Sequence, residues 1–311
     1  MLAFQIAQDL AQNDNQGFIN QIIQHFPTIN PSETDEFLKN IESNIKPKLF
    51  KVLNGKFSEE VHQHFLKNNN NSDPLIIANI KNGADSKNSI IHEAIIMANS
   101  ILQAGTTSQN FLVENLEWIA KASHWANFTS VASLGVIHRG NYSRAMEVMR
   151  PYLPGNLPTP KFYAHGGSLY GLGLIYYNTK NQETLNFLIN AIKNPTNNQN
   201  EVLIHGACLG IGLVGMASND EMLYEEMKNV LFTDSATTGE AAGLAIGLIM
   251  AGSRNGNVIN DILEYAHETK HEKIIRSIAI SLSIIMFNAE EKADALIEEL
   301  CNDKDAILRY I

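Results

Sequence analysis

The chain has 311 residues, 44% hydrophobic and 18% charged, which is the composition of an ordinary folded protein. Its formal net charge of −10 and its lack of a basic block argue against nucleic acid or an anionic membrane as the main partner. The longest apolar runs fall well short of the ~20 residues that a membrane span needs, and the N-terminus has no signal-peptide pattern. We therefore expect a protein of the cytoplasm and nucleus.

Residues 1–110 are predicted to form a helical segment. Apolar residues at helical spacing indicate two short helices within 1–26, a longer helix over 46–66, and further helices over 76–82 and 89–103. The polar, proline-containing stretch 27–45 and the asparagine-rich stretch 68–74 predict loops.

From about residue 128 one sequence pattern recurs, which predicts a small-residue helix followed by a polar break and an amphipathic helix. Its marker is an apolar residue followed by glycine, at Gly135, Gly173, Gly212 and Gly247, with Ser283 in the fifth copy. These positions are 38, 39, 35 and 36 residues apart. Five repeats of this length predict an all-α solenoid of helix pairs, and no stretch shows the alternation of a strand.

The first helix of each repeat is apolar on every side, whereas the second is amphipathic. Glycines also recur four residues apart, which places them on one helix face, so that two backbones can approach closely. We therefore predict an inner layer of small-residue helices and an outer amphipathic layer. The predicted structural positions are Gly135, Gly171, Gly173, Gly210, Gly212, Gly243, Gly247 and Ser283.

Two motifs suggest chemistry that their context does not support. His267, Glu268 and His271 spell H-E-x-x-H, the zinc-hydrolase signature, but they fall where one repeat ends and the next begins, with no later histidine. Gly210, Gly212 and Gly215 match the dinucleotide motif without the strand that it requires. We expect no metal, no cofactor and no catalytic residue, and we keep the zinc hydrolase as the least favoured alternative. Cys208 and Cys301 are expected to be buried thiols.

Four phrases, at 115–123, 128–140, 238–248 and 293–305, resemble the proteasome/cyclosome (PC) repeat scaffolds of the proteasome regulatory particle. The resemblance is continuous from about residue 111 to the end. It implies that a helical rod (1–110) precedes a PC-repeat domain (111–311) of about five repeats and the start of a sixth, in an open arc of a toroid. The sixth is indicated by residues 307–309, which match 274–276 at the opening of the fifth.

The resemblance also implies a non-catalytic scaffold in the base of the 26S proteasome, which organises ATPase and lid subunits for ubiquitin-dependent degradation. Docking of a ubiquitin receptor is expected on C-terminal residues of the family that this sequence does not contain. The sequence departs from the family at Ser283, which replaces a glycine, and in 27–45, which is shorter than the family's acidic insertion. A PC- or HEAT-type adaptor in another complex, such as the cyclosome, is the second reading.

Overall fold

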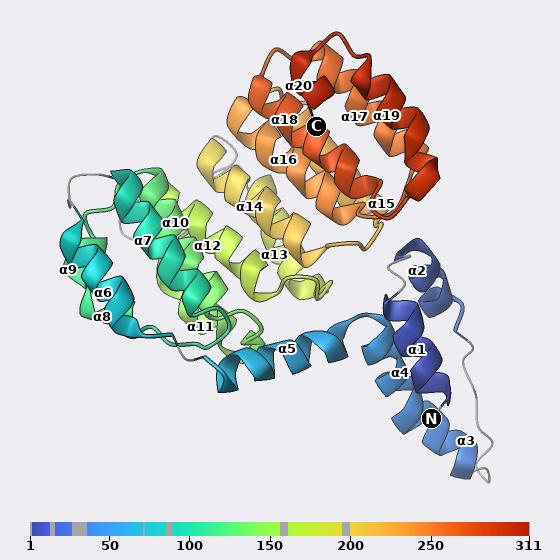
Figure 1. Ribbon diagram of the computed structural model, residues 1–311, viewed down its shortest axis with the longest axis horizontal. Coiled ribbons are helices and arrows are strands. Elements are labelled where there is room, and N and C mark those ends of the chain that lie inside the picture. The colour runs from blue at the N-terminus through green and yellow to red at the C-terminus, as the bar shows by residue number, and fades with distance from the viewer. Residues whose placement is uncertain are drawn as a thin grey trace.

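The structure is a computed structural model that describes residues 2–12, 16–26, 36–70, 72–84, 89–155, 161–194 and 200–310. All regular structure in these ranges is helical, with no strand. None of the helices among them is both long and apolar enough to span a membrane. Figure 1 shows a small N-terminal helical unit, a single bridging helix and a stack of paired helices.

The N-terminal unit comprises α1 (Leu2–Gln12), α2 (Gln16–Gln24), α3 (Glu36–Asn40), a π-helical turn (Ile41–Ile45) and α4 (Lys46–Leu53). It has a core of its own, built from Ala7, Ile19, Leu49 and Leu53. The predicted loop over 27–45 is therefore wrong for 36–45. Both prolines of that stretch precede residue 36, and Ile45 packs against the small core, so the helix extends backwards from α4. Residues 27–35 lie outside the described ranges.

The bridging helix α5 (Lys56–Asn68) is separate from α4, although the sequence predicted one helix over 46–66. The break is at Gly55, whose φ of +74° is a left-handed conformation that glycine adopts without steric cost. As Figure 1 shows, α5 runs alone from the N-terminal unit to the stack.

The inner layer of the stack consists of α7 (Ser89–Leu102), α10 (Trp125–Ile137), α12 (Phe162–Ile175), α14 (Glu201–Val214), α16 (Ala236–Ile249) and α18 (Glu272–Ile285). Each of them packs against the next. The outer elements are α6 (Pro74–Gly83), α8 (Asn110–Glu114), α9 (Leu116–Ile119), α11 (Ala145–Met149), α13 (Gln182–Lys193), α15 (Glu221–Leu231), α17 (Gly256–Glu268) and α19 (Asp294–Cys301). The last helix, α20 (Ala306–Tyr310), packs against α18 and α19.

The boundary predicted between residues 110 and 111 does not coincide with an edge of the inner layer. Helix α7 precedes that boundary, yet it lies beside α10 in the same way that α10 lies beside α12. The sequence did not reveal this because α7 carries no glycine, which is the marker of the repeats.

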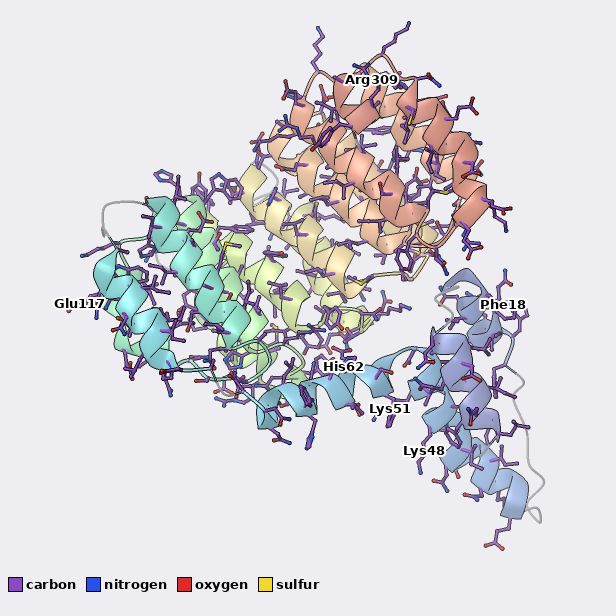
Figure 2. All side chains as sticks on the ribbon, in the orientation of Figure 1. Phe18, Lys48, Lys51, His62, Glu117 and Arg309 are labelled. Atoms are coloured by element: carbon purple, nitrogen blue, oxygen red, sulfur yellow. The ribbon has the colours of Figure 1, made fainter. Side chains whose placement is uncertain are left out.

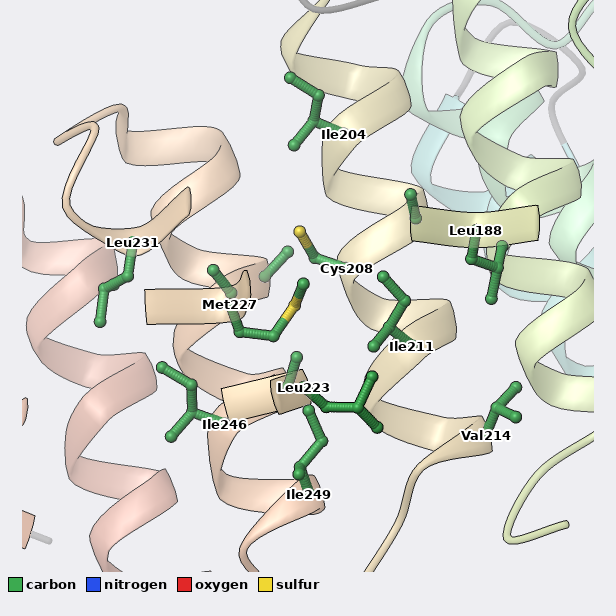
Figure 3. Packing of buried hydrophobic residues seen from close by; sticks show 14 of the residues in the cluster. Leu188, Ile204, Cys208, Ile211, Val214, Leu223, Met227, Leu231, Ile246 and Ile249 are labelled. Atoms are coloured by element: carbon green, nitrogen blue, oxygen red, sulfur yellow. The ribbon is translucent and has the colours of Figure 1, made fainter. Parts of the chain in front are cut away.

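One hydrophobic core runs through both layers from residue 112 to residue 308. In Figure 3, Met227 of α15 reaches between Cys208 of α14 and Ile246 of α16. Met227 and Cys208 are fully buried. The outer helices bury the apolar stripes that the sequence predicts, such as Leu185 and Leu188 in α13. The stripe of α19 differs, because Ile297 is 54% exposed at the end of the stack.

A repeated turn joins each inner helix to its outer helix and also bonds to the next layer. The N–H groups of Asn178 and Lys180 donate to the carbonyls of Leu213 and Val214, the last two residues of α14, at 2.8 and 2.9 Å. Equivalent pairs follow from Ala217 and Asn219 to α16 and from Gly252 and Arg254 to α18. All six donors have positive φ. The last carbonyls of a helix have no partner within it, so these turns satisfy them.

The residue after each of these turns caps the outer helix. The side chains of Asn181, Asp220 and Asn255 each accept a hydrogen bond from a backbone N–H in the first turn of α13, α15 and α17. Such caps typically contribute ~1 kcal/mol. One short segment therefore ends one helix, starts another and contacts a third.

The turn at Asn219 offers a test of this arrangement. Asn219 has φ +53°, and its side-chain oxygen makes no hydrogen bond within the described residues. We expect Asn219→Gly to change the free energy of unfolding little, because glycine adopts this conformation easily. Asn219→Val should cost about 1–3 kcal/mol, because a β-branched residue is strained there. Thermal unfolding of the two variants measures the difference, and equal midpoints would contradict it.

Candidate interaction surface

The inner helices meet through a fixed register of small residues. The marker glycine of one repeat faces the residue two positions before the marker of the next. A Cβ atom placed on Gly135 would lie 2.5 Å from the carbonyl oxygen of Gly171. A Cβ on Gly212 or Gly247 would lie 2.7 Å from the Cα of Ala245 or Ser281. These separations are too short for a Cβ, so the close contact requires glycine. Gly173 faces Gly210 in the same way.

The remaining predicted positions have different surroundings. A Cβ placed on Gly171 would lie 2.6 Å from Met149 Cε of the outer layer, and a Cβ on Gly210 would lie 2.8 Å from the Leu169 carbonyl oxygen. Gly243 lies against Ser277, and its carbonyl accepts a hydrogen bond from Ser281 Oγ at 2.7 Å. Ser283 occupies the marker position of α18 but is exposed. Besides α16 and α17, the helix packed against α18 is the short α20.

The outer layer is joined by polar contacts. Lys193 of α13 pairs with Glu226 of α15, and Asp261 of α17 accepts hydrogen bonds from Lys228 Nζ (2.5 Å) and Tyr224 Oη (2.7 Å) of α15. The hydrogen bonds from Lys228 and then Tyr224 hold the pKa of Asp261 below its usual value. Neighbouring outer helices are thus held in register by side chains that also face solvent.

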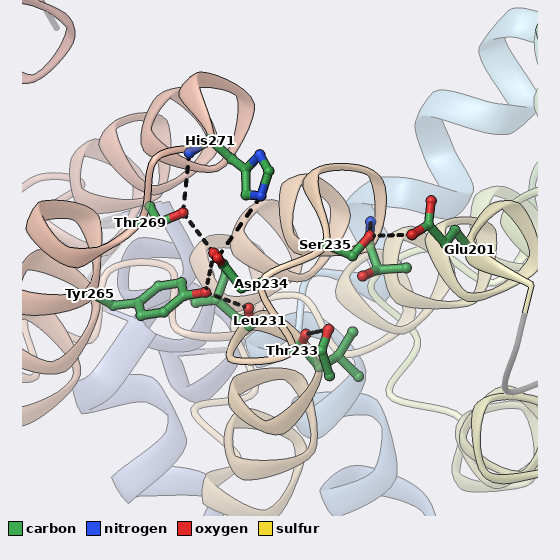
Figure 4. A network of polar contacts seen from close by, with 10 residues as sticks. Glu201, Leu231, Thr233, Asp234, Ser235, Tyr265, Thr269 and His271 are labelled. Carbon is green, nitrogen blue, oxygen red and sulfur yellow. Dashed lines mark hydrogen bonds and ion pairs between the residues drawn. The ribbon is translucent and has the colours of Figure 1, made fainter.

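A polar cluster lies where the C-terminal end of α17 meets the N-terminal end of α18 (Figure 4). Asp234 Oδ1 accepts hydrogen bonds from Thr269 Oγ1 (2.7 Å) and Tyr265 Oη (2.9 Å), and these lower the pKa of its carboxyl group. His271 Nε2 lies 3.9 Å from Asp234 Oδ2. The cluster connects the end of α15 to the next repeat.

The H-E-x-x-H motif does not form a metal site. Helix α17 ends at Glu268, and His271 is the residue before α18, so the two histidines do not share one helix face. His267 Nε2 is 2.7 Å from Asp303, whereas His271 turns to Asp234. No cluster of three metal-ligating side chains occurs in the described ranges. The zinc-hydrolase alternative therefore has no geometry to support it.

The remaining motif residues and the two cysteines lie in or directly after helices of the stack. Gly210 and Gly212 are buried within α14, and Gly215 directly follows it, so the dinucleotide motif is part of the helix packing. Cys208 is buried as expected, but Cys301 is exposed. The expectation of burial was therefore wrong for Cys301.

Helix α5 rests its polar side on the turns of the first repeats. The Gln63 side chain lies against Gly140, where a Cβ would overlap it, and Gln63 Nε2 donates to Glu59 Oε1 at 3.2 Å. Glu59 is buried, and burial raises the pKa of its carboxyl group even though Arg139 is near. The Arg139 guanidinium stacks 3.9 Å from the centre of the Tyr177 ring.

The N-terminal unit makes a second contact with the stack. Asn20 Nδ2 of α2 donates to the carbonyl of Ala217 at 3.2 Å, in the turn between α14 and α15. The unit is thus attached through α5 at one point and through α2 at another. Sequence reasoning missed both contacts. The only available signal was the four-residue spacing of Glu59 and Gln63, which places both on one face of α5.

Comparison with known families agrees with the repeat pattern of the inner and outer helices. Residues 206–240 and 241–275 each match the family described as proteasome/cyclosome repeat. These two units are PC repeats. Each matched unit contains the larger, C-terminal part of one inner helix and the whole of the outer helix that follows, α14 with α15 and α16 with α17.

Known relatives match the whole chain. The 26S proteasome regulatory subunit rpn2 of Schizosaccharomyces pombe is 39% identical over 315 residues, which cover 100% of this chain and 32% of that protein. The 26S proteasome non-ATPase regulatory subunit 1 homolog A of Arabidopsis thaliana is 39% identical over 348 residues, covering 100% and 34%. Its counterpart in Drosophila melanogaster, non-ATPase regulatory subunit 1, is 36% identical over 356 residues, covering 99% and 34%.

The chain is a homologue of these PC-repeat regulatory subunits and spans about a third of their length. The matched repeats contain Gly210, Gly212, Gly243 and Gly247 of the predicted positions, and the close contact between Gly212 and Ala245.

Gly206 tests the close packing of the inner layer. A Cβ on Gly206 of α14 would overlap the carbonyl of Gly166 in α12, whereas a Cβ on Gly256 meets nothing within 4 Å. Gly206→Ala gains ~1 kcal/mol of helix propensity but forces the two backbones apart, which costs roughly 1–3 kcal/mol or more. We expect its unfolding midpoint to fall, while that of Gly256→Ala stays the same or rises. Chemical denaturation of both variants gives the comparison, and a Gly206→Ala variant as stable as the parent would refute the register.

Glu59 gives a prediction about pH. Because burial raises its pKa, the protonated form favours the contact of α5 with the turns. This contribution is complete below the ordinary pKa of about 4.5 and is lost as the pH rises through the raised value. Glu59→Gln should therefore protect the amides of α5 from hydrogen exchange better than the parent at pH 7. The difference should shrink as the pH falls towards 4.5. Equal protection of parent and variant across this range would contradict the assignment.

Proposed function

We propose that the chain acts as a non-catalytic scaffold in the base of the 26S proteasome regulatory particle. The observation that supports this most is the match of the whole chain to proteins named as 26S proteasome regulatory subunits. In this proposal it organises ATPase and lid subunits for ubiquitin-dependent protein degradation, in the cytoplasm and nucleus.

The physical basis of such a role is rigidity. Helices that touch backbone to backbone, as α12 and α14 do through Gly173 and Gly210, have little freedom to slide. Turns that bond across layers fix the separation of each repeat from the next. A partner bound to one layer is then held at a set distance from a partner bound to another, as in other stacked-repeat proteins.

The side chains support a structural rather than a chemical role. His267 and His271, the residues that resembled a hydrolase motif, are each engaged by an aspartate of their own. The predicted positions lie in packing contacts or, at Ser283, at the end of the stack. The work of the molecule in this proposal is to place its partners.

Affinity purification tests the proposal. The tagged full chain, expressed in cells, should recover proteasomal ATPase and lid subunits together in quantitative mass spectrometry, relative to a tag-only control. Gly256→Ala should recover the same set, whereas Gly206→Ala should recover less, because its layers are displaced. Recovery of cyclosome ligase subunits in place of proteasomal ones would favour the alternative adaptor and overturn the proposal.

A further inference from the structure

A cavity of about 320 Å³ lies in the first layer of the stack (Figure 1), where the C-terminal ends of α5 and α7 meet the N-terminal ends of α6 and α8. Most of the side chains that line it carry an amide or a hydroxyl group, and the others include one lysine, one aspartate and an apolar wall. Ligand pockets in proteins range over roughly 300–1,000 Å³, so a cavity of this size suits a small polar ligand or the end of a chain.

Asn99 of α7 is a buried polar residue that lines this cavity, and it is only 3% exposed. Within the part of the chain that the structure describes, its carboxamide makes no hydrogen bond. The next residue, Ser100, is buried to the same degree, but its hydroxyl donates to the Met97 carbonyl at 2.8 Å. Buried amides normally have partners, because an unsatisfied one costs free energy. The Asn99 carboxamide therefore points to a ligand that offers it both a donor and an acceptor.

The rim of the cavity is held in place by hydrogen bonds of its own. Asn70 Nδ2 donates to the Leu102 carbonyl, and Gln103 Nε2 donates to Ser72 Oγ, each at 3.0 Å. The Ser72 N–H in turn donates to Asn70 Oδ1 at 3.0 Å. These bonds join the segment after α5 to the end of α7. The cavity is thus already shaped before a ligand arrives, which lowers the entropy cost of binding.

The two charged residues of the lining differ in their partners. Asp73 Oδ1 accepts a hydrogen bond from the Leu75 N–H at 2.9 Å, and the N-terminal end of α6 favours its negative charge. Lys67, which is exposed where it borders the cavity, has no ion pair and no side-chain hydrogen bond to any residue of the described ranges. An anionic group on the ligand would give Lys67 a partner.

From these observations we infer that the cavity binds an N-acylated amino acid that has a free carboxylate and an apolar side chain. The amide of such a ligand would pair with Asn99, and its carboxylate with Lys67. Its side chain would lie against the apolar wall formed by Ile77, Leu102 and Phe111. The C-terminal residue of a protein has this chemistry, and so has a small acylated amino acid. Capture of a terminal carboxylate is a known mode of peptide recognition.

Two simpler ligands would each leave one of these groups without a partner. Phosphate would pair with Lys67, but it has few donors to offer the side-chain oxygen of Asn99. A neutral sugar would satisfy Asn99 and would leave Lys67 without an anion. The combination of an amide and a carboxylate serves both residues.

The probe for this inference is a fluorescein-labelled tetrapeptide that ends in leucine with a free carboxylate. Fluorescence anisotropy with the purified full chain should show saturable binding, and the same peptide with a C-terminal amide should bind at least tenfold more weakly. Competition by N-acetylleucine separates the two sources of the ligand. Displacement as effective as by the unlabelled tetrapeptide assigns the site to small acylated amino acids, and displacement at least tenfold weaker assigns it to a protein C-terminus. Because only the purified chain is used, the result is independent of the proposed role in the proteasome.

Variants locate the binding site. Lys67→Gln should weaken the carboxylate peptide at least tenfold and leave the amide peptide unchanged. Lys48→Gln is its control, because Lys48 is an exposed lysine on α4 of the N-terminal unit, as Figure 2 shows. Asn99→Leu should abolish binding of both peptides, whereas Ser100→Ala should keep it. The thermal unfolding midpoint of Asn99→Leu should stay the same or rise, because the carboxamide that it removes has no partner in the described chain.

Four results would overturn the inference. They are no saturable binding of the carboxylate peptide, equal binding of the carboxylate and amide peptides, an unchanged affinity in Asn99→Leu, and displacement by phosphate or glucose as effective as by the unlabelled peptide. The last result would make the cavity a simple anion site or a sugar site.

Discussion

Backbone contact between successive inner helices is the constraint on which the rest of the structure depends. Gly135 against Gly171, Gly173 against Gly210, Gly212 against Ala245 and Gly247 against Ser281 form one series, in which the facing residue grows from hydrogen to methyl to hydroxymethyl. Gly247 and Ser281 also lie close together, and the Ser281 hydroxyl donates a hydrogen bond to the Gly243 carbonyl across the same contact. A larger side chain at any of these positions would separate two layers and, through the continuous core, displace the outer helices as well.

The two layers hold together by different physics. The inner layer gains van der Waals contact over closely spaced backbones. The outer layer is exposed, and its helices are linked by pairs such as Lys228 with Asp261. Exposed pairs of this kind contribute little to stability, so their value lies in the register of the helices. The close backbone contacts and the polar pairs are therefore made by different residues.

The sequence predicted much of the fold because period and glycine spacing are local signals. The marker positions pointed to a close approach, and the structure places Gly135, Gly173, Gly212 and Gly247 at backbone contacts. Prediction from the sequence failed where tertiary contacts determine the local structure. Ile45 packs on a small core and makes 36–45 helical, and Cys301 of α19 is exposed although its apolar helical surroundings predicted burial. The position of α5 depends on Glu59 and Gln63 meeting a turn more than 75 residues later, at Arg139 and Gly140, which no local pattern could indicate.

The turns between the layers have a consequence for how such a protein can diverge. Each one measures the step to the next repeat with two main-chain N–H groups and two main-chain carbonyls, as between Asn178 or Lys180 and the end of α14. The rise per repeat is thus set by main-chain atoms, which every residue except proline carries. Side chains on the exposed flanks can be exchanged over evolutionary time without altering the spacing of the array. The exposed surface of such an array can therefore change while the distance between successive repeats stays the same.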